Sequence, residues 1–428
     1  MRNKFIKSSL VLIVGGLISK ILAMVIRIIS NRIIGVKGIG LYTLVLPTFN
    51  LFITIATLSI PIAISKLVAE DIRNNKKMIF GIVPVILSIN IVIIIFILLN
   101  ARFIANSLLQ NDLLFFPIIA ISLTLPFITI SSICKGYFMG KEKMVPNVFS
   151  SIVEQIVRMV IIILFIPSLL KYGEVYAVTG IILINIISEI ASILILFLFL
   201  PKNFKLKKEY FKFDLNNLRD VASISIPTTI GRVISSIGMF LEPIILTSIL
   251  LYLGYSNDYI TYEYGIILGY VIPMVTAPQF LSMAISSALL PAISKYYSMG
   301  KVNKAKQKTL QASIISIIIA IPFTLIFYFY PKEVLNIIFH TDLGYNYLKI
   351  SSLLFIVSYV VGPLSSLLHA MNKSKELMYA NIISIVVKLT FLALLIYFNV
   401  GIISLVISSF ISYIVMIIFM LIEIKKYH

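Results

Sequence analysis

Long apolar runs, repeated along the whole chain, are the feature that most restricts what this sequence can fold into. A helix rises about 1.5 Å per residue, so each run is long enough to cross the roughly 30 Å hydrocarbon core of a bilayer. Of the 428 residues, 60% are hydrophobic and only 12% are charged. Twelve runs occur, at about Phe5–Ile34, Leu41–Ala69, Met78–Leu99, Leu113–Cys134, Val148–Leu170, Val175–Leu200, Val221–Leu251, Gly265–Ser294, Leu310–Tyr330, Tyr347–Ala370, Met378–Phe398 and Val400–Ile424. The sequence therefore predicts an all-α polytopic membrane protein with about twelve transmembrane helices.

The positive charges are divided unequally between the two sides of these runs. The net charge is +19, yet the cations gather in short loops on one side, which argues against nucleic acid as a partner. Twenty-four lysines and arginines, Lys135 among them, fall in loops on the side of the N-terminus, and four fall on the other side: Lys37, Arg102, Lys171 and Lys332. Because cytoplasmic loops carry the excess of basic residues, both termini are expected in the cytoplasm.

A basic stretch divides the chain into two halves. Residues 201–220 are predicted to form a cytoplasmic linker between an N-lobe, residues 1–200, and a C-lobe, residues 221–428, with six helices each. The linker is expected to lie on the anionic inner leaflet or to gather an anionic lipid substrate there. Lys141–Glu154 aligns with Lys375–Lys388 at an offset of 234, which indicates two repeats related by a pseudo-two-fold axis along the membrane normal.

Several charged residues lie inside the apolar runs, where they are costly unless they face a partner or a wet cavity. Lys20 and Arg27 share a helix face, and Glu154 and Arg158 are spaced to pair at i, i+4. The predicted substrate-binding residues are Lys20, Arg27, Glu154, Arg158, Glu189, Arg232, Glu242 and Lys388. These comprise five cations and three acids, a surplus that suits an anionic ligand such as a phosphate. The alternative is that these charges neutralise one another and stabilise packing.

Other residue types give weaker indications. Pro47 and Pro273 fall in corresponding runs of the two halves and are hinge candidates, although such prolines also occur as simple packing kinks. The three histidines and the single cysteine lack metal-ligand spacing, and the chain has no GxxxxGK[ST] motif. No metal and no cofactor is therefore expected.

Particular segments resemble a known family of transporters. They are Ser19–Leu22, Arg27, Arg32–Gly35, Gly40–Tyr42, Pro61–Glu70, Lys135–Gly140, Glu154–Gln155 with Arg158, Ile226–Thr228, Gly231–Arg232, Leu241–Pro243 and Leu290–Ser294. The sequence resembles the stage V sporulation protein B family, in the polysaccharide transporter branch of the multidrug, oligosaccharidyl-lipid and polysaccharide (MOP) flippase superfamily. The resemblance covers nearly the whole chain, but the family's final pair of helices has no counterpart among the twelve runs.

The resemblance implies a function in the bacterial cytoplasmic membrane. Members of this branch are two-lobed transporters that flip lipid-linked peptidoglycan or polysaccharide precursors from the inner to the outer leaflet. In the related lipid II flippases, basic residues of the first helix line the cavity. Lys20 matches the first of them, and the next falls on Ile26, beside Arg27. The implied partners are a polyprenyl-diphosphate-linked oligosaccharide, membrane lipid and a sodium ion or proton as coupling ion, with the transporter acting as a monomer.

Three other functions remain open from the sequence. A cation-coupled multidrug exporter of the same superfamily would need membrane acids as its dominant feature, whereas the first run here is basic. A membrane glycosyltransferase would need catalytic carboxylates or histidines in a sizeable outer loop, and the predicted outer loops are short. A non-transporting scaffold for envelope or spore assembly is the third. Alternating access by a transporter that is not an enzyme is the leading prediction.

Overall fold

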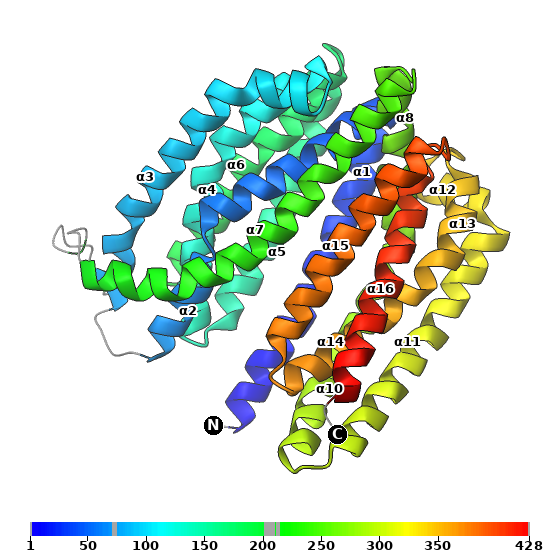
Figure 1. The fold of residues 1–428 in the computed structure, drawn as a ribbon. Coiled ribbons are helices and arrows are strands. Elements are labelled where there is room, and N and C mark those ends of the chain that lie inside the picture. The colour runs from blue at the N-terminus through cyan, green and yellow to red at the C-terminus, as the bar shows by residue number, and fades with distance from the viewer. Residues whose placement is uncertain (1, 71–74, 201–209, 211–214, 427–428) are drawn as a thin grey trace. The chain divides into compact units, whose positions relative to one another are not determined.

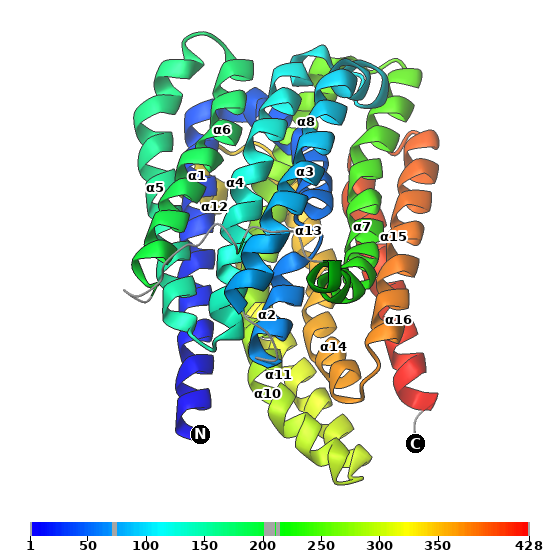
Figure 2. The ribbon, with the colours of Figure 1, turned by 90° about the vertical axis from the view of Figure 1, so that its left-hand side faces the viewer.

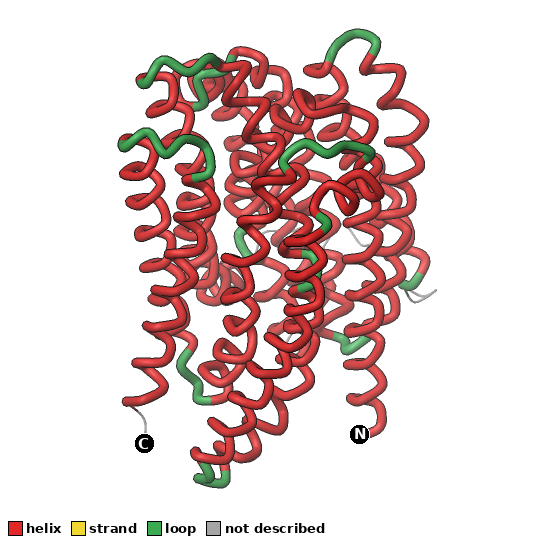
Figure 3. Tube along the Cα trace, turned by 90° about the vertical axis from the view of Figure 1, so that its right-hand side faces the viewer, coloured by secondary structure: helices red, strands yellow, loops and turns green. Residues whose placement is uncertain are grey.

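The computed structural model describes residues 2–70, 75–200, 210 and 215–426, and it contains helices without strands in that part of the chain (Figure 3). Short turns connect most of the helices, as expected for neighbouring antiparallel spans. The chain forms two compact units, unit 1 at residues 1–236 and unit 2 at residues 237–428. The all-α prediction is confirmed.

Unit 1 is built from the first six long helices and the start of the seventh. Its elements are α1 Arg2–Thr57, α2 Ile60–Glu70, α3 Asn75–Arg102, the π-helical turn η1 Phe103–Leu108, the 3₁₀ turn η2 Asp112–Leu114, α4 Phe115–Gly140, α5 Met144–Leu170, α6 Glu174–Leu198 and α7 Leu215–Tyr252. The division between the units falls inside α7.

Unit 2 contains the end of α7 and the helices that follow it. They are α8 Asn257–Gly265, the π-helical turn η4 Ile266–Val271, α9 Ile272–Thr276, α10 Gln279–Ser298, α11 Val302–Phe329, α12 Pro331–Phe339, α13 Tyr345–Phe355, the 3₁₀ turn η5 Ile356–Val360, α14 Val361–Ala370, α15 Ser374–Tyr397 and α16 Ser404–Lys426.

Helix α1 contains two of the predicted membrane spans. Gly35 has φ 67° and ψ −179°, a combination that is essentially restricted to glycine. After Gly35 the chain turns and runs back toward the end at which it began (Figures 1 and 2). The predicted runs Phe5–Ile34 and Leu41–Ala69 therefore correspond to the two arms on either side of Gly35.

The number of candidate spans agrees with this division. The described residues contain 10 helices that are long and apolar enough to cross a membrane, or 11 if the bent pair Asn257–Thr276 and Gln279–Ser298 forms one span. The first of them, Val14–Glu70, has 57 residues, which is about 85 Å of helix and enough for two crossings. When the bent pair is counted as one span and the two arms of Val14–Glu70 are counted separately, the total is twelve, the number of predicted runs. The protein is a multi-pass membrane protein.

The two compact units do not test the predicted lobe boundaries at residues 200 and 221. Most of the predicted linker 201–220, namely residues 201–209 and 211–214, lies outside the described residues. The first part of α7 groups with unit 1, while its last part groups with unit 2. The lobes at 1–200 and 221–428 stay a prediction.

Close packing of α4 on α2 fixes the position of the residues around it. A Cβ atom at Gly136 would lie 2.8 Å from the Pro61 carbonyl oxygen, and one at Gly140 would lie 2.6 Å from the Ser65 carbonyl oxygen. Two small residues four positions apart let membrane helices approach this closely. The neighbour of Gly136 in the sequence, Lys135, is therefore held by backbone packing rather than by a flexible loop.

Candidate functional site

Four ionisable side chains gather in the membrane-spanning part of unit 1: Lys135 from α4, Glu154 and Arg158 from α5, and Glu189 from α6. We call them the unit 1 charge cluster. Lys135 Nζ donates to Glu154 Oε2 at 2.8 Å, and Arg158 Nη2 donates to Glu154 Oε1 at 2.9 Å. Glu154 therefore uses one carboxylate oxygen for each cation, and the pairing with Arg158 expected from the i, i+4 spacing is confirmed.

Burial strengthens these contacts. The Glu154 side chain is 8% exposed, whereas Lys135 and Arg158 keep 25% and 19% of theirs accessible. Arg158 Nη2 also donates to Ser188 Oγ at 3.2 Å. Because the acid is enclosed and the two bases remain partly accessible, the basic side chains are the ones able to meet an incoming ligand.

Glu189 is the least satisfied member of the unit 1 charge cluster. It is 8% exposed, and its Oε2 atom has no hydrogen-bond partner among the residues that the structure describes. It lies beside Ser131 and within electrostatic range of Lys135, Glu154 and Arg158. A buried carboxylate oxygen without a partner is costly, so Glu189 is a group to which a cation or a hydrogen-bond donor is favoured to bind.

The basic face of α1 borders this cluster. Helix α1 packs against α5, and Tyr42 of α1 lies within electrostatic range of both Arg27 and Arg158. Arg27 is half-buried, while Lys20, seven residues earlier on the same helix, is exposed. The structure thus brings Glu154, Arg158 and Glu189 together from the predicted set, while Arg27 and Lys20 lie on the neighbouring helix α1.

Arg232 contacts a different feature of unit 1. Its Nη1 atom lies 3.5 Å from Ser59 Oγ, at the point where α1 ends and α2 begins. Leu58 and Ser59 have φ values of 47° and 49°, which is rare for consecutive non-glycine residues and strained. The Asn90 side chain donates to the Ala56 carbonyl oxygen at 3.2 Å. This hydrogen bond satisfies a carbonyl group at the end of α1, where helical hydrogen bonds are missing.

The hinge candidates lie in unlike surroundings. At Pro47 the helix continues, and the break in this span is instead at Leu58 and Ser59. Pro273 stands in the first turn of α9, directly after the π-helical turn η4 and before the 43° bend between α9 and α10. A hinge role for either proline stays a prediction.

Unit 2 contains an ion pair between two of its membrane-spanning helices, α7 and α15. Lys388 Nζ of α15 donates to Glu242 Oε2 of α7 at 2.5 Å, where Gly238 lets α7 approach Ile385 of α15 closely. Tyr413 lies within electrostatic range of both charges. Each of the two predicted residues is thus the counter-ion of the other.

The sequence missed Lys135 as a member of this cluster. Lys135 was counted among the loop cations because the predicted run ended at Cys134, whereas α4 continues to Gly140 and Lys135 pairs with Glu154. An ion pair with a neighbouring helix lets α4 keep the ammonium group partly buried. The available signal was the pair Gly136 and Gly140, since residues with this spacing are typical of packed membrane helices.

The described residues contain no group of three or more His, Cys, Asp or Glu side chains able to hold a metal ion. The chemistry that the unit 1 charge cluster offers is therefore that of ammonium, guanidinium and carboxylate groups. These groups bind anions, form bidentate bonds to phosphate and exchange protons.

Comparison of the sequence with known families gives two matches. The model of the family described as "Polysaccharide biosynthesis protein" matches residues 5–297, and the MatE model matches residues 243–395. Stage V sporulation protein B of Bacillus subtilis (strain 168) is 29% identical over 397 residues, which are 90% of this chain and 77% of the relative.

Solved structures with similar folds include two kinds of transporter. An inward-facing multidrug resistance MATE family transporter of the MOP superfamily aligns with a TM-score of 0.76 and 14% identity, over 95% of each chain. The lipid II flippase MurJ in an inward closed conformation aligns with a TM-score of 0.73 and 15% identity, over 96% of this chain and 87% of that chain. At these identities the likeness concerns the fold, which is the two-lobed fold of the MOP superfamily.

Proposed function

Because the chain belongs to the polysaccharide biosynthesis protein family and has the fold of MOP superfamily transporters, we propose that it flips a lipid-linked precursor across the bacterial cytoplasmic membrane. The substrate is a polyprenyl-diphosphate that bears a peptidoglycan or polysaccharide unit, and it moves from the inner to the outer leaflet by alternating access. The relatives are transporters and flippases rather than enzymes.

The observation that carries this proposal is the excess of positive charge inside unit 1. Its spans hold the deep cations Lys20, Arg27, Lys135, Arg158 and Arg232 against the acids Glu154 and Glu189. Guanidinium groups bind phosphate through paired hydrogen bonds, so this excess favours a diphosphate headgroup. A neutral sugar or a cationic drug would not need it.

The membrane potential supports export of such a headgroup. Both termini are assigned to the cytoplasm from the loop charges, and moving one charge across 100 mV is worth about 2.3 kcal/mol. An anionic headgroup that leaves an inside-negative compartment moves down this field. A sodium ion or a proton is the proposed coupling ion if the potential alone does not suffice, and Glu189 is its proposed binding residue.

Reconstitution into liposomes with a fluorescent lipid-linked precursor tests this function. Lys20→Ala, Arg158→Ala and Arg232→Ala are expected to slow flipping at equal protein levels, because each removes a cation that contacts the headgroup during the cycle. Lys388→Ala tests whether the C-lobe contributes as the sequence predicts. Lys304→Gln, at an exposed position of α11, is the matched control. Wild-type rates in all four alanine variants would contradict the proposal.

A cation-coupled multidrug exporter is the second candidate, and the MatE match is the observation that favours it. Such an exporter needs a carboxylate able to bind its coupling ion. Glu154 and Glu242 each pair with basic side chains at 2.9 Å or less, so Glu189 is the acid left for that role. Dye efflux driven by a sodium or proton gradient, and abolished by Glu189→Gln, Glu154→Gln or Glu242→Gln, would favour the exporter over the flippase. A folded protein that transports neither lipid nor dye would instead indicate an assembly scaffold.

A further inference from the structure

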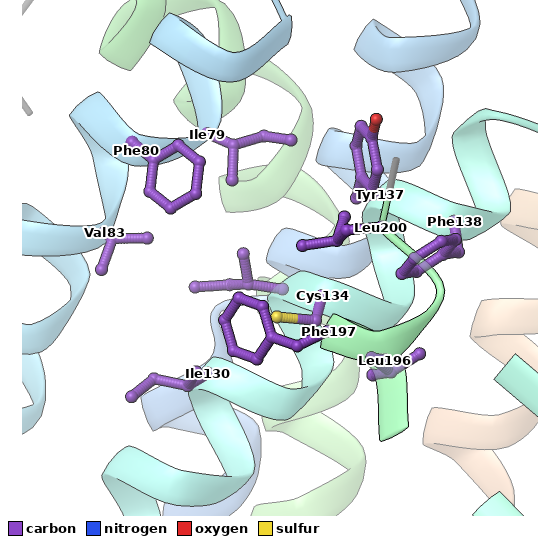
Figure 4. A pocket seen from close by; sticks show the side chains of 11 residues that line it. Ile79, Phe80, Val83, Ile130, Cys134, Tyr137, Phe138, Leu196, Phe197 and Leu200 are labelled. Carbon is purple, nitrogen blue, oxygen red and sulfur yellow. The ribbon is translucent and has the colours of Figure 1, made fainter. Parts of the chain in front are cut away.

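Unit 1 contains an apolar pocket that the proposed transport function does not use. It has a volume of about 140 Å³ and is lined by side chains of α3, α4 and α6. Figure 4 shows Phe80 from α3, Cys134 from α4 and Phe197 from α6 around it, with the Tyr137 hydroxyl at its edge. Among the described residues the surface of this pocket is entirely apolar, which excludes a sugar or a phosphate as its occupant.

The size and opening of the pocket fit a flexible hydrocarbon. An apolar cavity of roughly 150 Å³ stays dry and takes up a benzene-sized molecule, so this one has room for a short segment of a lipid chain. Phe197 is 44% exposed, so an accessible apolar side chain borders the pocket at the surface of α6. A chain can therefore enter from the bilayer without crossing a polar surface.

Positive charges mark the end of the membrane at which the pocket lies. Lys77 precedes the lining residue Ile79 by two residues at the start of α3, and Lys141 and Lys143 follow the lining residue Phe138 at the end of α4. Lysines at the edge of a leaflet attract anionic lipid headgroups. An amphiphile with an apolar chain and an anionic head thus matches both parts of this region.

We propose that the pocket between α3, α4 and α6 binds an acyl chain of an anionic membrane phospholipid, whose headgroup lies at Lys77, Lys141 and Lys143. This site is separate from the unit 1 charge cluster. Cys134 lines the pocket, whereas the next residue, Lys135, is turned by about 100° around α4 and contacts Glu154. The proposal does not depend on the transported substrate.

The absence of tryptophan from the sequence gives a direct test. Phe80→Trp or Phe197→Trp places a single fluorophore in the pocket of the full-length protein in nanodiscs. Phosphatidylglycerol with brominated acyl chains is expected to quench this fluorescence more strongly than brominated phosphatidylcholine at the same mole fraction. Each lysine that contacts the headgroup contributes a preference of up to about fivefold. Phe165→Trp, which is 59% exposed on α5, is the control in bulk lipid, where the two lipids should quench equally.

Two further variants assign the effect to the site. Replacing Lys77, Lys141 and Lys143 by glutamine should remove the preference for phosphatidylglycerol, and Val83→Phe should reduce quenching by filling the pocket. Equal quenching by the two lipids in both tryptophan variants would overturn the proposal. So would quenching that unbrominated polyprenyl phosphate reverses while unbrominated phosphatidylglycerol does not, because the occupant would then be a polyprenyl chain.

Discussion

Units 1 and 2 differ in how the charged side chains of their membrane-spanning helices are paired. Unit 1 groups Lys135, Glu154, Arg158 and Glu189 across three helices and leaves a carboxylate oxygen of Glu189 without a hydrogen bond among the described residues. Unit 2 instead joins Glu242 and Lys388 in a single short ion pair. The first arrangement leaves a buried hydrogen-bond acceptor for another group, whereas in the second each charge is the counter-ion of the other.

The internal repeat makes this comparison more specific. Glu154 and Lys388 are equivalent positions in the two halves of the sequence, yet they carry opposite charges. Each finds its counter-ion within its own unit: Lys135 and Arg158 for Glu154, and Glu242 for Lys388. The repeat has therefore kept a charged position while reversing its sign. Unit 1 is therefore the proposed ligand-binding half, while in unit 2 Glu242 and Lys388 pair with each other.

The largest expected effect comes from removing the acid at the centre of the unit 1 charge cluster. Glu154→Gln leaves both Lys135 and Arg158 without their carboxylate partner. Breaking a buried pair by removing one partner typically costs about 3–5 kcal/mol. The thermal midpoint, followed by size-exclusion chromatography of a fluorescent fusion, should fall sharply. Glu242→Gln exposes a single cation and should cost less, so an equal loss in the two variants would contradict the difference between the units.

The close approach of α4 to α2 should be nearly as sensitive. Gly136→Ala places a methyl group 2.8 Å from the Pro61 carbonyl oxygen, and backbone atoms cannot move aside cheaply. We expect a destabilisation of about 1–3 kcal/mol, measured as a lower thermal midpoint. The equivalent position in unit 2 is Ala370, which already carries a methyl group, so Ala370→Ser is the control and should have a much smaller effect.

Lys388 and Glu242 of unit 2 should be energetically coupled to each other in a double-mutant cycle. Lys388→Gln and Glu242→Gln are each expected to be destabilising, because each leaves the other residue's charge without its counter-ion. The double variant should recover part of the loss, with a coupling energy of about 0.5–3 kcal/mol. Denaturation of the four proteins measures it. Strictly additive losses would mean that the two charges are not coupled to each other, which would contradict the pair.

Glu189→Gln should have the smallest effect on stability and a clear effect on transport. Its Oε2 atom makes no hydrogen bond among the described residues, so we expect a change in stability of less than about 1 kcal/mol. Removing one acid makes unit 1 more cationic, and half-saturation by the lipid-linked precursor should occur at a lower concentration. The concentration dependence of flipping checks this. Weaker binding of the precursor would show that Glu189 itself holds the headgroup.

Local features of the fold were predictable because they depend on near neighbours in the sequence. The twelve apolar runs follow from hydropathy and length, and the contact between Glu154 and Arg158 follows from helix periodicity. The break in the second span lies at Leu58 and Ser59 rather than at Pro47. It directly precedes Pro61 in the first turn of α2, and Pro61 has no backbone N–H to donate to the Thr57 carbonyl. The sequence did not show which of the two prolines interrupts the helix.

The sequence by itself determined that this protein is a helical membrane protein with costly charges inside its spans and more deep cations than acids. Only the tertiary structure decided which charges meet. Lys388 and Glu242 are 146 residues apart in the chain, and Lys135 reaches Glu154 from a neighbouring helix. Such pairs depend on how helices cross and rotate against one another. Helix rotation is set by side-chain packing over the whole interface, and no local pattern of residues specifies it.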